Sequence, residues 1–180
     1  MINEVAENIP VGKNVRVMFQ DEGRFGRISL PRRCWAPPGT RPLCGAHTYA
    51  YSAISPLDGA IDSLIAPHAN TEVMAIFLRQ VAECFNDDFI IMFMDKASWH
   101  TAGKLKVPEN MKLLFLPPYS PQLTPVEHLW KEIKEKYFEN VVFDSIDAVE
   151  NRLMKALTFM NQTPDTVKSF SGFNWMVTSL

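Results

Sequence analysis

The chain has few cysteines, no long apolar run and no excess of positive charge. Its three cysteines are an odd number without the paired close spacing of a zinc site, which favours reduced thiols. The longest wholly apolar run, Phe89 to Met94, is far shorter than the roughly 20 residues that a membrane-spanning helix needs. The N-terminus also lacks a basic and then apolar signal pattern. We therefore expect a cytosolic protein with no membrane contact.

The formal net charge of −2 argues against a strongly basic nucleic-acid binder, but the charge is unevenly placed. Basic residues dominate between Lys13 and Arg41, whereas Arg79 is the one basic residue between Asp58 and Asp95. This asymmetry is compatible with one phosphate-facing surface, although exposed charge is more often a solvated face. A hydrophobic content of 47% and a charged content of 21% are ordinary for one globular domain.

The first third of the chain has the period-2 pattern of strands. Val15, Val17 and Phe19 alternate with other residues and predict a half-buried strand, whose core-facing row Asp21 continues. Glycines at positions 23 and 26 then predict a turn. Further strands are expected over 27–30, 47–54 and 60–65.

The rest of the chain alternates helical and apolar strand patterns. Asn70 or Thr71 can cap a first helix, and Asp95 directly follows a strand that is apolar on both faces. The order predicts a three-layer α/β domain around one mixed sheet, in which ligands bind beyond the strand ends. The expected elements are a helix over 71–85, strands over 89–94 and 111–116, and helices over 125–138, 145–160 and 164–170.

Two aspartates end strands of this expected sheet. Asp21 lies on a core-facing row and needs a partner there, so a salt bridge to Arg24 or Arg27 explains it as well as a bound metal does. Asp95 has the position of an ordinary loop or cap residue, and Lys96 is placed to neutralise it. It also emerges from the middle of a core, which favours a functional role equally.

Glu127 has both a structural and a functional interpretation. Thr124, Pro125 and Glu127 match a capping box, with Thr124 as the N-cap and Glu127 at the third helical position. A capping Glu needs no further role. However, Glu127 also flanks the apolar stripe that contains Val126 and Trp130, so its side chain can point toward the sheet. The helix N-terminus would keep it ionised, as a metal ligand requires.

Taken together, Asp21, Asp95 and Glu127 predict a metal site. Converging carboxylates repel one another, and Mg²⁺ or Mn²⁺ is the usual means of stabilising them. Two such ions can activate a nucleophilic oxygen and stabilise the leaving oxygen of a phosphodiester. His100 and Lys96 are candidates either to hydrogen-bond a metal ligand or to contact DNA, whereas His128 is expected on the helix surface.

Several further motifs lie at 19–22, 34–39, 49–54, at Asp95 with His100, and at 116–130. The last contains a Pro-Pro-Tyr-Ser-Pro run followed by Pro-x-Glu-x-x-Trp, which is highly specific, whereas a lone Asp-Glu pair is a weak signal. Together these motifs resemble the catalytic domain of the DDE transposases of the mariner superfamily, specifically its bacterial insertion-sequence branch. The resemblance covers nearly the whole chain in the expected order.

The resemblance implies a ribonuclease-H-like fold with the catalytic triad at Asp21, Asp95 and Glu127. It also implies two Mg²⁺ ions, for which Mn²⁺ can substitute, cleavage at transposon ends, and attack by the freed 3′-hydroxyl on target DNA, usually at TA. The implied partners are DNA and a second copy in a homodimer, acting on nucleoid DNA in the bacterial cytoplasm. By the same resemblance, Arg32 and Arg33 contact DNA phosphate or the second subunit.

The chain departs from the family in two ways. Lys96, Gln122, Thr124 and His128 replace residues that are common beside the triad in relatives, which bears on tuning more than on identity. Relatives also carry an N-terminal helix-turn-helix region, and no such pattern precedes the first strand here. We therefore expect one catalytic domain over 1–180, with two alternatives. One is a truncated, non-catalytic remnant that dimerises with or modulates a full-length transposase, and the other is a structure-specific nuclease of the same fold.

Overall fold

The structure, a computed structural model, describes residues 12–27, 47–95, 105–117 and 124–172. These residues form a five-stranded sheet in the order β3-β2-β1-β4-β5. The strands are β1 (Asn14–Gly26), β2 (His47–Ile54), β3 (Ile61–Ala66), β4 (Asp88–Met94) and β5 (Met111–Phe115). The helices are α2 (Thr71–Cys84), α3 (Pro125–Ile133), α4 (Ile146–Gln162) and α5 (Pro164–Ser171), and a π-helical turn, η2 (Lys134–Phe138), follows α3.

The sheet is mixed, as predicted. β1 pairs with β2, and β2 with β3, in antiparallel fashion, whereas β1 pairs with β4, and β4 with β5, in parallel. Phe19 and Phe93 are the last pair between β1 and β4. Asp21 lies two residues beyond Phe19, and Asp95 lies two residues beyond Phe93. This register therefore places both aspartates at the carboxyl end of β4.

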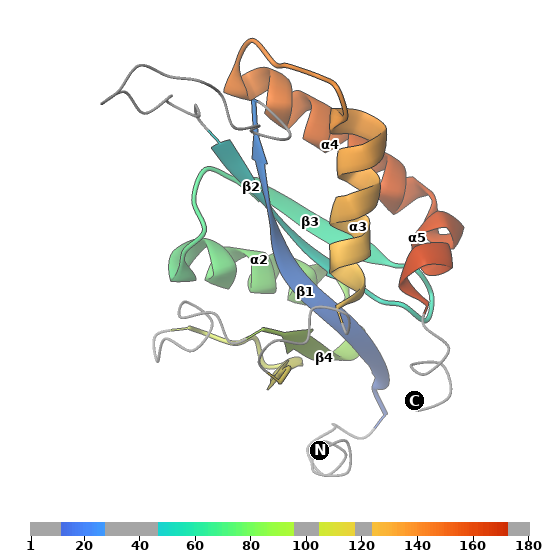
Figure 1. The fold of residues 1–180 in the computed structure, drawn as a ribbon. Coiled ribbons are helices and arrows are strands. Elements are labelled where there is room, and N and C mark those ends of the chain that lie inside the picture. Colours follow the sequence, from blue (N-terminus) through green and yellow to red (C-terminus); the bar gives the residue numbers. More distant parts are fainter. Residues whose placement is uncertain (1–11, 28–46, 96–104, 118–123, 173–180) are drawn as a thin grey trace.

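The helices cover both faces of the sheet (Figure 1). α3, α4 and α5 pack on one face, and α2 packs on the other. Side chains of β1 alternate between the two cores, with Val17 and Phe19 beneath α3 and Met18 beneath α2. Because β1 is covered on both sides, it is more deeply buried than the half-buried strand that the sequence predicts.

The turn predicted at positions 23 to 26 is wrong. β1 runs without interruption to Gly26, because its second half pairs with β2 as far as the Gly26–His47 pair. A β-carbon on Gly23 would lie 2.8 Å from Cδ2 of Trp130, so this glycine admits an indole from α3 rather than a turn. The strand predicted over 27–30 lies outside the described residues except for Arg27, which is in a bend.

The other predicted elements within the described ranges agree with the structure to within one or two residues. The Asn70 cap of α2 is confirmed, since its side chain accepts a hydrogen bond from the Val73 backbone N at 2.9 Å. Ser145 caps α4 in the same way, at 3.1 Å from the Ala148 backbone N. Within the described ranges we find no helix with the length and apolar character that crossing a bilayer requires.

The helix predicted over 125–138 is present, but its last turn is wider than an α-helical turn. Residues of η2 follow a π-helical spacing, so the core position after Ile133 falls five residues later instead of four. Phe138 therefore enters the core at 1% exposure, and Tyr137 is left partly buried beside it. The apolar stripe of this helix therefore ends at Phe138 rather than at Tyr137, where α-helical spacing would place its last residue.

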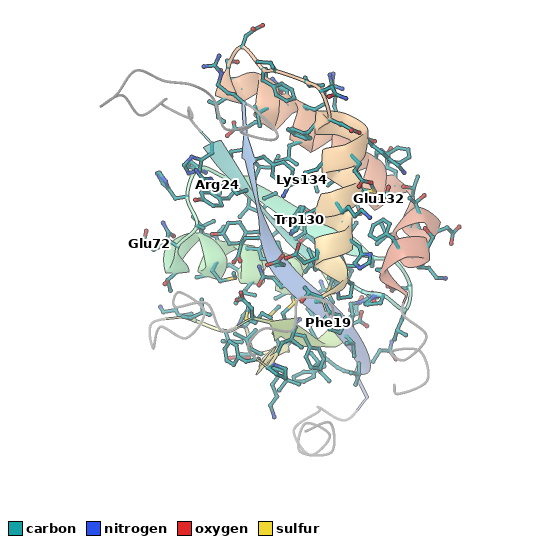
Figure 2. The ribbon with its side chains drawn as sticks, in the orientation of Figure 1. Phe19, Arg24, Glu72, Trp130, Glu132 and Lys134 are labelled. Carbon is teal, nitrogen blue, oxygen red and sulfur yellow. The ribbon has the colours of Figure 1, made fainter. Side chains whose placement is uncertain are left out.

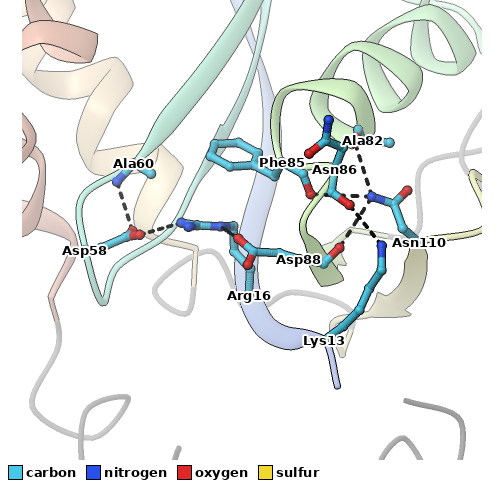
Figure 3. Close-up of polar contacts among 9 residues, drawn as sticks. All are labelled: Lys13, Arg16, Asp58, Ala60, Ala82, Phe85, Asn86, Asp88 and Asn110. Carbon is cyan, nitrogen blue, oxygen red and sulfur yellow. Dashed lines mark hydrogen bonds and ion pairs between the residues drawn. The ribbon is translucent and has the colours of Figure 1, made fainter. Parts of the chain in front are cut away.

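Arg16 joins three elements at the amino end of β1 (Figure 3). It forms ion pairs with Asp88 at the start of β4 and with Asp58 in the turn between β2 and β3. Its guanidinium carbon also lies 4.5 Å from the centre of the Phe85 ring. This cluster holds the parallel strands β1 and β4 in register at one end of the sheet, and Asp21 and Asp95 lie at the other end.

Candidate active site

The backbone positions of Asp21 and Asp95 correspond on neighbouring parallel strands. Alternation along β1 puts Asp21 on the same face as Val17 and Phe19, which is the face that α3 covers. The rings of Phe19 and Phe93 stack on this face with their centres 5.0 Å apart. Asp21, within β1, and Asp95, directly after β4, therefore both lie at the carboxyl end of β4, and Asp21 lies beside the α3 core.

Asp21 is held by a residue from α3. The Nε1–H of Trp130 donates a hydrogen bond to Oδ2 of Asp21 at 3.1 Å, and Trp130 is itself only 3% exposed. Figure 2 shows Trp130 between α3 and β1. Burial, the negative charge of Glu127 and that of Glu22 together raise the pKa of Asp21 to about 7. Asp21 and Glu127 are therefore close enough to repel each other.

Glu127 reaches this position because it lies near the start of α3. It is three residues before Trp130, so the two side chains share one face of the helix. The N-terminal end of α3 carries positive partial charge, which favours the ionised form of a carboxylate there. α3 thus presents one hydrogen-bond donor and one negative charge to the same aspartate.

The predicted capping box is wrong in its Thr124 half. Thr124 makes no side-chain cap hydrogen bond, and its backbone is extended, with φ −103° and ψ 103°. The backbone N–H of Glu127 instead donates to the Thr124 carbonyl oxygen at 3.2 Å. Pro125 does occupy the first helical position, as predicted. The local reason for a Glu at position 127 is therefore weaker than the sequence pattern indicates.

The salt bridges considered for Asp21 are not formed. Arg24 Nη2 lies 3.1 Å from Nδ1 of His47, and Arg27 Nε donates to the Phe143 carbonyl oxygen at 2.8 Å. Arg24 is also three residues from Asp21 on a strand, so alternation directs it to the opposite face. Among the described residues, Trp130 takes the place that the sequence assigns to an arginine.

The structure gathers some of the predicted site residues and not others. In the part of the chain that is described, no three His, Cys, Asp or Glu side chains are grouped so that they could hold a metal ion. Asp21 and Glu127 are close enough for their charges to interact, and Glu127 on α3 and Asp95 after β4 are both exposed. His128 is exposed on α3, as expected. Other predicted residues, Arg32, Arg33, Lys96 and His100, lie outside the described ranges.

Sequence reasoning missed the roles of Trp130 and Gly23. It assigned Trp130 to packing alone, although a Trp three residues after Glu127 on one helix face was a signal for a shared site. It assigned Gly23 to a turn, although a glycine inside a strand also signals the close approach of another side chain. Gly23 makes room for the indole, and the indole then reaches Asp21.

The carboxylates fit a divalent metal ion. Burial first, and then the nearby charges of Glu127 and Glu22, raise the pKa of Asp21, so its ionised form lies in an unfavourable environment. Carboxylate oxygens are the donors that Mg²⁺ and Mn²⁺ prefer. A cation between the strand end and α3 would relieve this repulsion.

Comparison with known proteins supports this interpretation. The model of the family described as DDE superfamily endonuclease matches residues 16–150, which run from β1 into α4. The chain is also 31% identical over 128 residues to the uncharacterised protein y4pE/y4sA of Sinorhizobium fredii (strain NBRC 101917 / NGR234). That match covers 71% of this chain and 95% of the relative.

Solved structures of Mos1 transposase are similar in fold. The Mos1 mariner paired end complex with Mn matches with a TM-score of 0.60 at 18% identity, over 87% of this chain and 53% of that one. The Mos1 Strand Transfer Complex matches with a TM-score of 0.57 at 17% identity, over 88% of this chain and 55% of that one. The predicted ribonuclease-H-like fold is thereby confirmed. The chain spans about half the length of the Mos1 chains.

Proposed function

Since this chain belongs to the family of DDE superfamily endonucleases, we propose that it is a transposase catalytic domain that cleaves DNA ends and transfers them to target DNA. The observation that carries the proposal is the position of Asp21. It is a partly buried carboxylate on the central strand, repelled by Glu127 and next to the carboxyl end of β4, which Asp95 follows. A site that concentrates carboxylates in this way is arranged for divalent metal chemistry on a phosphodiester.

Asp21, Asp95 and Glu127 would hold two Mg²⁺ ions, or Mn²⁺ in their place. When bound, such ions would supply the positive charge that activates an attacking oxygen and stabilises a leaving oxygen. Trp130 acts as a positioning residue, because its hydrogen bond to Oδ2 fixes the orientation of the Asp21 carboxylate. The similar Mos1 complexes with Mn and with Mg support the choice of metal.

The proposed substrates are transposon-end DNA and a target that is usually TA. The similar Mos1 assemblies include a paired-end complex with the left transposon end and a strand transfer complex, which supports both DNA steps. We further propose the bacterial insertion-sequence branch of the mariner superfamily, a homodimer in the active complex, and action on nucleoid DNA in the bacterial cytoplasm. Arg32 and Arg33 remain proposed contacts to DNA or to the second subunit.

A plasmid nicking assay tests this function. The chain incubated with supercoiled plasmid and Mn²⁺ is expected to convert it to the nicked form, and a chelator is expected to stop the conversion. Asp95→Asn, purified in the same way, controls for contaminating nuclease and should leave the plasmid supercoiled. Equal nicking by parent and variant would refute the proposal. Binding of plasmid by the parent without any nicking would favour the non-catalytic alternative.

A further inference from the structure

Three polar side chains are linked by hydrogen bonds on the face of the sheet opposite Asp21. Arg24 on β1 stands directly across from Tyr49 on β2, and His47 lies two residues before Tyr49 on the same face. Arg24 Nη2 lies 3.1 Å from His47 Nδ1, and Tyr49 Oη lies 3.3 Å from His47 Nε2. The rings of His47 and Tyr49 meet edge to face with their centres 5.3 Å apart.

The directions of these hydrogen bonds leave unused donors on Arg24 and on Tyr49. A guanidinium can only donate, so Nδ1 of His47 accepts from Arg24. In the neutral imidazole the proton then lies on Nε2, which donates to Oη of Tyr49. The hydroxyl proton of Tyr49 is therefore directed to another acceptor, and Arg24 keeps further N–H groups. A ligand that fits must offer acceptor oxygens and negative charge.

No carboxylate of the described ranges forms an ion pair with Arg24. Among the described residues, its hydrogen-bond partner is an imidazole nitrogen, and no ion pair involves it. Arg16, in contrast, forms ion pairs with Asp58 and Asp88. Arg24 is also exposed, whereas Arg16 is partly buried. As far as the described residues show, its guanidinium is therefore accessible to a ligand from solvent.

The position along β1 fits a ligand that also reaches the carboxylate edge. Arg24 is three residues beyond Asp21, so their backbone positions lie roughly 10 Å apart along β1, and a ligand that reaches both must pass the side of β1 that β4 leaves unpaired beyond Phe19. Phosphates of one DNA strand advance by about 3.4 Å along the helix axis, so this distance corresponds to a few nucleotides. β1 continues past Phe19–Phe93, its last pair with β4, so β4 does not cover this part of β1. Figure 2 shows Arg24 and Trp130 on opposite sides of β1.

We propose that Arg24, His47 and Tyr49 form a binding site for a backbone phosphate of DNA, a few nucleotides from the phosphate that is cleaved. Arg24 supplies the charge, His47 fixes the guanidinium and the tyrosine, and Tyr49 donates to a phosphate oxygen. The inference rests on the proposed function only in that DNA is named as the ligand.

DNA binding measured in a chelator tests this site independently of cleavage. Fluorescence anisotropy with a short duplex is recorded at a series of NaCl concentrations for the parent, Arg24→Ala and Tyr49→Phe. Arg24→Ala is expected to weaken binding and to lower the salt slope by about one, because one phosphate contact is lost. Tyr49→Phe is expected to weaken binding by roughly 10-fold with an unchanged slope, since it removes a hydrogen bond without a charge.

Two matched variants control for general effects. Arg152→Ala removes an exposed arginine on α4, and Tyr137→Phe removes a hydroxyl in η2, so both should bind as the parent does. Circular dichroism verifies folding, and the near-isosteric Tyr49→Phe keeps the test valid should Arg24→Ala not fold. Binding by Arg24→Ala and Tyr49→Phe equal to that of the controls, or no DNA binding by the parent, would overturn this inference. A parent that binds in the expected way without nicking would contradict only the proposed function.

Discussion

Glu127→Gln is expected to abolish DNA cleavage while leaving the fold intact. The amide keeps the size and the backbone position of Glu127 but removes its negative charge, which is one of the causes of the raised pKa of Asp21. Replacing a residue that only supports a metal ligand typically lowers activity by roughly 10- to 100-fold. Replacing a ligand itself should therefore lower cleavage activity by more than about 100-fold. Stability should change by less than about 1 kcal/mol, because lost attraction to the helix N-terminus is offset by relieved repulsion. Plasmid nicking and denaturant unfolding measure the two effects.

Thr124→Ala is the matched control at the start of the same helix. A capping threonine would contribute about 1 kcal/mol, but Thr124 makes no side-chain cap hydrogen bond. We therefore expect a stability change below about 0.5 kcal/mol and nicking close to that of the parent. Cleavage by Glu127→Gln at the parent rate under saturating Mg²⁺ would remove Glu127 from the catalytic site.

Asp21→Asn is expected to stabilise the chain in the absence of divalent metal above neutral pH. The pKa of Asp21 is raised to about 7 in the folded state, against about 3.9 in the unfolded state. A raised pKa means that the folded state binds more protons, so parent stability falls as the pH rises from about 4 to about 7. The asparagine avoids this penalty, and because Asp21 is partly exposed we expect a gain on the order of 2 kcal/mol at pH 8.

Unfolding experiments at several pH values measure this effect. The difference between parent and Asp21→Asn should be present at pH 8 and should shrink toward pH 4. Added Mn²⁺ should raise the stability of the parent but not that of Asp21→Asn, since a ligand stabilises the state that binds it. Asp144→Asn removes an exposed carboxylate and controls for net charge. Equal stability of the parent and Asp21→Asn at pH 8 without metal would contradict a folded state that disfavours the ionised Asp21 carboxylate.

The order of strands and helices could be predicted because each element has a local pattern. β4 has an apolar run, and α2 has helical spacing after an asparagine cap. The length of β1 could not be predicted, since Gly23 resembles a turn signal unless the indole that packs on it is known. The π-helical turn of η2 also has no local signature, because its effect is a shift of one residue in which side chain faces the core.

The identities of the candidate carboxylates were readable from the sequence, but their partners were not. The sequence offers arginines three and six positions away as one of two explanations for Asp21, the other being a metal, whereas its side-chain hydrogen bond comes from Trp130, 109 positions along the chain. Side-chain alternation on β1 sends Arg24 to the other face, where it meets His47. Nearness in sequence is a poor guide to charge pairing on a strand, because neighbouring side chains alternate between two environments.

Calorimetric titration of Mn²⁺ into the parent and into Asp95→Asn tests the central claim most directly. The register of β1 and β4 places Asp95 beside Asp21, so the test of a joint site is whether Asp95 takes part in metal binding. If the three carboxylates hold metal jointly, the parent should bind Mn²⁺ with saturable heat, and Asp95→Asn should bind it more than about 10-fold more weakly. Equal affinity in the two proteins, or no binding by the parent, would contradict a shared metal site and the cleavage chemistry proposed for it.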